Sequence, residues 1–201
     1  MIVVGITGGV GCGKSRVLEY LEANVNGRIL LADQVAHLVK EPGTEVFGRL
    51  IELLGREILA EDGTIDRMKM AKVIFSDRQK LSLVNGMIHP AVKQYILNAV
   101  EEERKKGEIA VFFIEAALLI EGGYRPWLDE LWYIYSDEAV RMKRLREGRG
   151  YSEEKIRSIM EQQLTEEEFH RYADVVIDNS GNFSDTCVRL SEECRRLGIW
   201  K

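Results

Sequence analysis

The chain has 201 residues, of which 45% are hydrophobic and 30% are charged. A chain of this length and balance can bury one sizeable core, which excludes a disordered chain, a disulfide-stapled miniprotein and a collagen-like fibre. Its 28 Lys and Arg residues against 33 Asp and Glu residues give a net charge of −5. An acidic chain is a poor non-specific binder of nucleic acid or of an anionic membrane, so we expect neither partner.

The cysteines and the N-terminus predict a cytoplasmic location. Cys12, Cys187 and Cys194 form no CxxC pair of the kind that binds metals, and they are odd in number, so we expect free thiols in a reducing compartment. The first residues lack the basic start and cleavage site of a secretory signal, and no stretch approaches twenty apolar residues without charge. The sequence sets no oligomeric state and is compatible with a monomer.

The first predicted strand, residues 2–7, leads into the strongest motif of the chain. Residues 8–15 read GGVGCGKS, a complete GxxxxGK[ST] Walker A pattern, and a helical pattern follows over residues 14–23. Glycines let consecutive backbone N–H groups turn toward a phosphate, and a helix N-terminus favours negative charge. We expect Lys14 to reach the β- and γ-phosphates and the Ser15 hydroxyl to ligate Mg²⁺. The residues predicted to bind nucleotide here are Gly9, Gly11, Cys12, Gly13, Lys14, Ser15 and Arg16.

Other glycine-rich nucleotide-binding loops do not match. The dinucleotide fingerprint GxGxxG fails because its third glycine comes one residue early. No Asn is followed by Lys, which excludes the base-reading motif of regulatory GTPases, and the signature of ABC-type ATPases is absent. A small-molecule kinase that uses ATP is the best-supported class.

Asp33 follows the second predicted strand, residues 28–32, at the edge of the sheet where α/β proteins bind ligands. A sugar hydroxyl is a weak nucleophile, and a carboxylate that accepts its proton typically contributes about 10²- to 10⁴-fold to the rate. Asp33 is therefore the predicted base. The alternative is an N-cap for a helix that begins at Gln34, and the two roles are compatible.

A long helical insertion, residues 34–108, separates the second predicted strand from the third. It has far more residues than one crossover helix needs, and Gly43, Gly55 and an Asp62-Gly63 turn punctuate it. A helical pattern over residues 92–105 closes it, and Pro90 is well placed as the first residue of that helix. We expect this insertion to bind the acceptor.

The third and fourth predicted strands are residues 109–115 and 130–135. Glu115 ends the third strand, where P-loop enzymes often carry a carboxylate that holds Mg²⁺. We predict that it holds Mg²⁺ through water or contacts the acceptor, and a structural role in a loop is the alternative.

A second helical insertion, residues 138–170, follows the fourth strand and is predicted to be a lid. It is rich in arginine, Ser152 is a good helix start, and Thr165 and Glu168 match a capping box. Guanidinium groups stabilise the charge of a transferred phosphate, so we predict this role for Arg144 and Arg149. Their neighbours Arg141 and Arg146 are expected to be partly solvated, and an exposed helix face is the alternative for all of them.

With a fifth strand at residues 174–177, the alternation of strands and helices predicts an α/β fold. Each strand is short and continuously apolar, which is typical of a parallel sheet covered on both faces. We therefore expect a P-loop core with a five-stranded parallel sheet flanked by helices. Residues 1–201 form a single domain in this interpretation, with the acceptor-binding insertion and the lid as subregions.

The chain resembles the dephospho-CoA kinases nearly from end to end. The matching segments are residues 5–15, 32–33, 42–43, 55, 62–63, 66–67, 85, 88–92 and 118–121, the arginine-rich insertion, and residues 162, 173–174 and 177–179. The family usually has Asp at position 115 and Pro at position 117, whereas this chain has Glu115 and Ala117. Its arginine spacing in the second insertion also differs by about one residue.

The resemblance implies a kinase that uses ATP and Mg²⁺ to phosphorylate the ribose 3′-hydroxyl of dephospho-CoA, the last step of coenzyme A biosynthesis. It also implies the strand order of nucleoside monophosphate kinases. Two other classes stay open: another small-metabolite P-loop kinase for a nucleoside or shikimate-like acceptor, and a non-catalytic nucleotide-dependent switch.

The resemblance adds roles for further residues. It points to Asp33 as the base and places His89 in the acceptor pocket, where the alternative is a turn beside Pro90. Arg67 is either a pocket contact or half of an ion pair with Asp66. Asn179, after the fifth strand, is expected to contact adenine through its main chain. Cys12, where the family often has Ser, is either a tolerated small residue or an oxidation-prone thiol.

Overall fold

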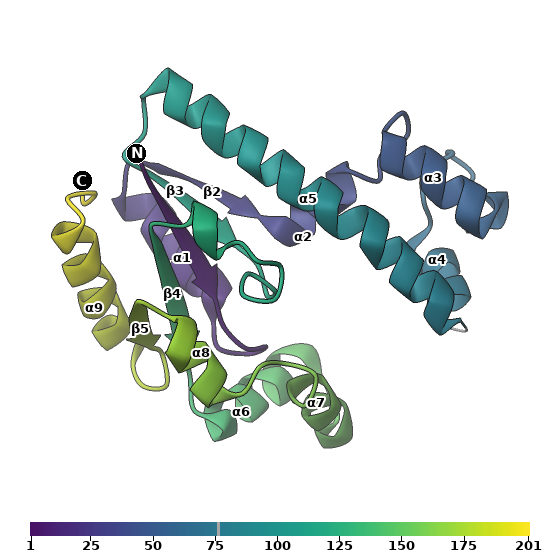
Figure 1. Cartoon of the computed structure of the whole chain (residues 1–201). Coiled ribbons are helices and arrows are strands. Elements are labelled where there is room, and N and C mark those ends of the chain that lie inside the picture. Colours follow the sequence, from purple (N-terminus) through teal and green to yellow (C-terminus); the bar gives the residue numbers. More distant parts are fainter. Residues whose placement is uncertain (76) are drawn as a thin grey trace. The chain divides into compact units, whose positions relative to one another are not determined.

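The computed structural model describes residues 1–75 and 77–201. These residues form a five-stranded sheet with the strand order β2-β3-β1-β4-β5 (Figure 1). Strand β1 runs parallel to β3 and to β4, and β4 runs parallel to β5. The strands are β1 (Ile2–Thr7), β2 (Gly27–Leu31), β3 (Val111–Glu115), β4 (Glu130–Tyr135) and β5 (Val175–Asp178). The predicted sheet and the strand order implied by the resemblance are both confirmed.

Both faces of the sheet are covered. In β3 the consecutive side chains Phe112, Phe113 and Ile114 are all fully buried. Successive side chains of a strand point to opposite faces, so burial of neighbours requires packing on each side. This is why the strands read as continuous apolar runs in the sequence.

The described chain divides into two compact units. The core unit comprises Met1–Leu30 and Glu103–Lys201, and the helical unit comprises Leu31–Glu102. The helices of the core unit are α1 (Lys14–Asn24), η2 (Arg125–Trp127), α6 (Glu138–Arg149), α7 (Glu153–Met160), α8 (Glu166–Tyr172) and α9 (Phe183–Arg196). The helical unit contains α2 (Ala32–Leu38), α3 (Glu45–Leu54), η1 (Arg56–Ile58), α4 (Arg67–Phe75) and most of α5 (Arg78–Lys106).

The helical unit has an apolar core of its own. Val46, Leu50 and Leu54 recur every fourth residue on one face of α3 and are buried. Gly55 ends this helix with a φ of 86°, a backbone conformation that residues with a side chain rarely adopt. Gly63 has a φ of 83°, which confirms the predicted turn at that position.

Helix α5 is longer than the sequence predicts. It contains Pro90 in its interior, so the prediction that Pro90 begins a helix is wrong. An interior proline costs about 3 kcal/mol because it loses one backbone hydrogen bond and crowds the preceding turn. The buried side chains Val84, Val92 and Ile96 lie on one face of α5 on both sides of the proline, and their packing outweighs this cost.

The second insertion begins its helices where the sequence predicts. Ser152 caps α7 by accepting a hydrogen bond from the Lys155 backbone N–H at 3.3 Å. Thr165 and Glu168 form the predicted capping box at the start of α8. The Phe169 ring then stacks on Tyr133 with ring centroids 4.7 Å apart, which docks α8 on β4.

We expect Thr165→Ala to lower the free energy of unfolding by about 1 kcal/mol, because the Glu168 backbone N–H loses the Thr165 hydroxyl as its acceptor. Thr165→Ser keeps the hydroxyl and serves as the control. Urea denaturation measures both. Equal stability of the alanine variant and the unchanged protein would show that the capping box contributes nothing.

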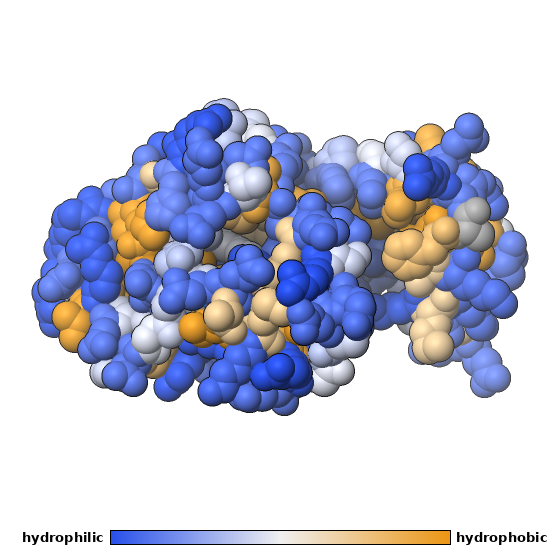
Figure 2. Space-filling model, turned by 90° about the horizontal axis from the view of Figure 1, so that it is seen from below, coloured by the Kyte–Doolittle hydropathy of each residue, from blue (hydrophilic) through white to orange (hydrophobic). Residues whose placement is uncertain are grey.

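No helix within residues 1–75 and 77–201 has the length and apolar character needed to span a bilayer. Figure 2 shows hydrophilic residues over most of one face, with apolar side chains in separate patches.

Candidate active site

The phosphate loop connects β1 to α1 in the core unit. Gly11 and Gly13 have φ values of 80° and 93°, in the left-handed region where glycine is favoured. A Cβ atom on Gly13 would overlap the Asn179 amide, and one on Gly9 would overlap the Arg141 guanidinium. The backbone therefore favours glycine at positions 11 and 13, and a side chain at position 9 or 13 would displace the group that packs against it.

Lys14 directs its ammonium group to the beginning of the loop. Its Nζ donates a hydrogen bond to the Gly8 carbonyl at 2.7 Å and lies 3.7 Å from Glu115 Oε1. Ile6 pairs with Glu115 across β1 and β3, so the parallel register brings the carboxylate to this edge of the sheet. The Lys14 and Glu115 side chains are only 15% and 16% exposed. Glu115 therefore helps to hold the lysine in place.

The first turn of α1 remains open to solvent. Ser15 and Arg16 are both exposed. The Arg16 guanidinium carbon lies 3.9 Å from the centroid of the Phe183 ring, a cation–π contact that links α1 to α9. The Ser15 hydroxyl is thus accessible at a helix N-terminus.

The Cys12 carbonyl is anchored from outside the loop. It accepts hydrogen bonds from Asn179 Nδ2 at 2.8 Å, Ser136 Oγ at 3.1 Å and Arg144 Nη1 at 3.3 Å. The C=O and the following N–H of a trans peptide point in opposite directions. Because the Cys12 oxygen is fixed on the outside, the Gly13 N–H is directed into the loop, where the sequence predicts a phosphate.

Both the side chain and the backbone of Asn179 make hydrogen bonds. Its Oδ1 accepts from Thr186 Oγ1 at 3.1 Å, and its backbone N–H donates to the Tyr135 carbonyl at 2.8 Å. Its backbone carbonyl accepts from Arg144 Nη2 at 2.8 Å, and it lies 2.9 Å from Ser136 Oγ, whose single proton it shares with the Cys12 carbonyl. Asn179 and Ser136 are each 2% exposed, and buried polar groups are costly unless they are paired. The sequence predicts only a main-chain contact with adenine for Asn179 and misses this side-chain role.

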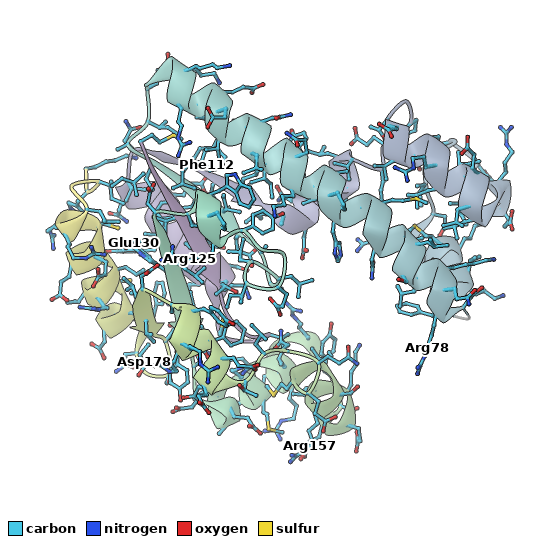
Figure 3. All side chains as sticks on the ribbon, in the orientation of Figure 1. Arg78, Phe112, Arg125, Glu130, Arg157 and Asp178 are labelled. Carbon is cyan, nitrogen blue, oxygen red and sulfur yellow. The ribbon has the colours of Figure 1, made fainter. Side chains whose placement is uncertain are left out.

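The arginines of the second insertion differ in their surroundings. Arg141 Nε donates to the Val10 carbonyl at 2.9 Å, and Arg144 contacts the loop at Cys12. Arg149 is exposed in the last turn of α6, and its role in phosphoryl transfer stays a prediction. Arg157 projects outward from α7 and pairs with Glu153 at 2.7 Å (Figure 3). Arg141, expected to be a partly solvated neighbour, is thus a contact of the phosphate loop.

Asp33 lies in the first turn of α2, two residues after the end of β2, and is exposed. Helix α2 begins at Ala32 with Leu31 as its N-cap, so the interpretation of Asp33 as an N-cap is wrong. Ala32 is a strong helix former and already adopts helical geometry, which starts the helix two residues earlier than predicted.

The helical unit contains a cavity of about 410 Å³ that combines cationic and apolar side chains. His37, Lys40 and Arg67 line it, and burial is the largest cause that lowers the pKa of both His37 and Lys40. Neighbouring cations lower these pKa values further: Lys40 and Arg67 act on His37, and Arg67 acts on Lys40. The apolar part includes Met70 and Ile88. Such a cavity suits an anionic ligand that also has an apolar portion.

Asp66 and His89 are not among the described residues that line the cavity. Asp66 Oδ1 accepts hydrogen bonds from the backbone N–H groups of Met68 at 2.8 Å and Lys69 at 3.0 Å, which caps α4. His89 is exposed on α5, and the cavity lining found among the described residues does not include it. A contact between His89 and the acceptor stays a prediction.

The strand order, the glycine-rich loop between β1 and α1, and the arginine side chains against that loop define a P-loop kinase. A family model described as dephospho-CoA kinase matches residues 2–185. The chain belongs to this family.

Individual relatives agree with the family match. The chain is 37% identical to the dephospho-CoA kinase of Dehalococcoides mccartyi, covering 94% of this chain and 96% of that protein. It is 35% identical to the dephospho-CoA kinase of Carboxydothermus hydrogenoformans, covering 92% of this chain and 88% of that protein.

Solved structures share the fold. TT1252 from Thermus thermophilus has a TM-score of 0.79 and 28% identity, covering 98% of this chain and 97% of that one. Dephospho-CoA kinase from Campylobacter jejuni has a TM-score of 0.74 and 22% identity, covering 98% of both chains. The resemblance found in the sequence is therefore confirmed.

Proposed function

We propose that this chain transfers the γ-phosphoryl group of ATP to the ribose 3′-hydroxyl of dephospho-CoA, the last step of coenzyme A biosynthesis. The observation that carries this proposal is the family match over residues 2–185, which coincides with a complete phosphate loop. Because ATP is the donor, the family match also favours the predicted cytoplasmic location.

Asp33 is the proposed base of the reaction. Its exposed carboxylate accepts the proton of the ribose hydroxyl while that oxygen attacks the γ-phosphorus. The bond from the γ-phosphorus to the β,γ-bridging oxygen breaks, and ADP leaves. No covalent intermediate with the protein is involved.

The chain stabilises the charge that spreads over the transferred phosphoryl group. Lys14 and the inward N–H groups of the phosphate loop hold the β- and γ-phosphates. The proposed contributions of Arg144 and Arg149 add positive charge at the transition state. Arg144 lies beside the phosphate loop, where its guanidinium donates to the Cys12 carbonyl.

The site has oxygen groups that fit Mg²⁺. The Ser15 hydroxyl is exposed at the start of α1, and the Glu115 carboxylate ends β3 on the same edge of the sheet as Lys14. Mg²⁺ prefers oxygen ligands and commonly keeps several waters. Ser15 is the proposed direct ligand and Glu115 a ligand through water. When bound, the ion neutralises charge on the β- and γ-phosphate oxygens.

The cavity of the helical unit is the proposed acceptor site. Dephospho-CoA has a diphosphate and a long pantetheine arm that combines amide groups with a dimethyl-substituted carbon and methylene groups. His37, Lys40 and Arg67 suit the diphosphate, and the apolar lining around Met70 and Ile88 suits the arm.

The cavity predicts a pH dependence for acceptor binding. The pKa of His37 in the free protein lies below its ordinary value of 6.5 because burial and nearby cations disfavour the charged ring. An anionic ligand favours the charged ring and raises this pKa, so binding takes up a proton and strengthens as the pH falls toward the pKa of the free protein.

We expect the affinity for dephospho-CoA to be about three- to tenfold higher at pH 5.5 than at pH 8, since one pKa unit corresponds to a factor of ten. Isothermal titration calorimetry over this range measures it, and His37→Gln should flatten the profile. An equally steep profile in His37→Gln would exclude this contact.

The function itself is tested by a steady-state assay with Mg·ATP and a panel of acceptors. We expect turnover with dephospho-CoA and none with adenosine or shikimate, and phosphorus NMR should locate the new phosphate on the 3′ oxygen. Turnover with another acceptor alone would assign a different kinase. Tight nucleotide binding without turnover on any acceptor would favour a switch protein.

A further inference from the structure

Gln163 connects the second insertion to the phosphate loop. It lies between α7 and α8, and its Oε1 accepts hydrogen bonds from the Val10 backbone N–H and from Arg141 Nη2, each at 3.0 Å. Arg141 Nε donates to the Val10 carbonyl at 2.9 Å. The three residues thus form a closed ring of hydrogen bonds that uses both backbone groups of Val10. We call this ring the Val10 clasp.

The Val10 clasp lies at the end of the loop that receives the terminal phosphate. Lys14, which reaches the β- and γ-phosphates in such loops, directs its Nζ to Gly8 at the beginning of the loop. The Arg141 guanidinium packs directly against Gly9, the next residue. Arg141 and the Lys14 ammonium therefore approach the same end of the loop.

A neutral amide is well suited to hold Arg141. A carboxylate at position 163 would neutralise the guanidinium, whereas the glutamine oxygen fixes it and leaves its charge for a ligand. A free arginine side chain has rotamer entropy to lose when it becomes ordered. Anchoring Arg141 to both Val10 and Gln163 before nucleotide binds removes part of that cost.

We propose that Gln163 is a positioning residue that sets Arg141 against the terminal phosphate and so makes the protein favour ATP over ADP. The role in turnover rests on the proposed kinase function, but the preference between the nucleotides does not. The distinction arises because ADP lacks the phosphate that Arg141 contacts.

The test compares ATP and ADP affinities of Gln163→Met by isothermal titration calorimetry. Methionine has a similar length and removes the acceptor oxygen. We expect ATP to bind about tenfold more weakly and ADP to change less than twofold, because Arg141 loses the charge-assisted hydrogen bond that anchors it, while the Val10 N–H loses a neutral one. Gln162→Met, at the exposed neighbouring position, is the matched control and should leave both affinities unchanged.

A double-mutant cycle separates positioning from a general structural role. Arg141→Ala should weaken ATP binding selectively, and adding Gln163→Met to it should change ATP affinity less than twofold, because Gln163 acts through Arg141. Additive losses, an equal loss of ADP affinity, or an unchanged ATP affinity in Gln163→Met would each overturn the proposal. A protein that binds ATP with the expected ratios but does not phosphorylate dephospho-CoA would refute the proposed function alone.

Discussion

Asp33→Asn is expected to lower kcat about 10²- to 10⁴-fold while the affinity for ATP stays within twofold of the unchanged protein. The amide has nearly the shape of the carboxylate and cannot accept the hydroxyl proton. Asp33 is exposed and asparagine has nearly the same size, so we expect the substitution to leave the fold unaltered. Steady-state kinetics gives kcat, and calorimetry gives the affinity for ATP.

Gln34→Ala is the matched control for this experiment. Gln34 is the next residue in the same turn of α2 and is also exposed, so it reports any general effect of altering this helix. The control should retain kcat within about twofold, as expected for an exposed site outside the chemistry. Near-normal turnover of Asp33→Asn with intact ATP binding would show that Asp33 is not the base and that another group accepts the proton.

Asn179→Leu is expected to weaken ATP and ADP binding alike, by about 10- to 100-fold, because it loosens the Cys12 carbonyl that directs the Gly13 N–H into the loop. It should also lower the free energy of unfolding by about 1–3 kcal/mol, since the buried Asn179 side chain loses its hydrogen bonds to the Cys12 carbonyl and to the Thr186 hydroxyl, while Thr186 keeps the Asp178 carbonyl as its acceptor. Calorimetry with each nucleotide and urea denaturation measure the two effects.

Asn182→Leu provides the comparison. Asn182 precedes α9, is exposed, and makes no side-chain capping hydrogen bond to that helix. We expect it to match the unchanged protein in both measurements. A folded Asn179→Leu protein with unchanged ADP affinity would show that the Cys12 carbonyl does not control the phosphate-binding N–H groups.

The Asn179 and Gln163 variants together distinguish two supports of one loop. Asn179 acts at Cys12, near the start of α1, where both nucleotides have phosphates. Gln163 is proposed to act through Arg141 beside Val10, at the end of the loop where we expect only ATP to have a phosphate. We therefore expect Asn179→Leu to weaken the binding of both ATP and ADP, and Gln163→Met to weaken the binding of ATP alone.

The sequence alone determined the features that depend on neighbouring residues. Buried parallel strands appear as continuous apolar runs because both of their faces are covered. The phosphate loop is recognisable because its glycines, Lys14 and Ser15 must be adjacent for their chemistry. The capping box at Thr165 is also local, since its partners are three residues apart. These features sufficed to indicate the fold class and a small-molecule kinase, and the resemblance over nearly the whole chain indicated the family.

Only the tertiary structure decided which distant side chains hold the loop. Asn179 and Cys12 are 167 residues apart, and they meet because β1 and β5 both pair with β4 in one sheet. The resemblance pointed to Gln162, yet its neighbour Gln163 contacts Val10, because the direction of a side chain depends on how its segment packs. Pro90 lies within a helix for the same reason: burial along α5 outweighs a local preference. The spacing of residues along the sequence does not show how distant segments pack, so these contacts could not be predicted from it.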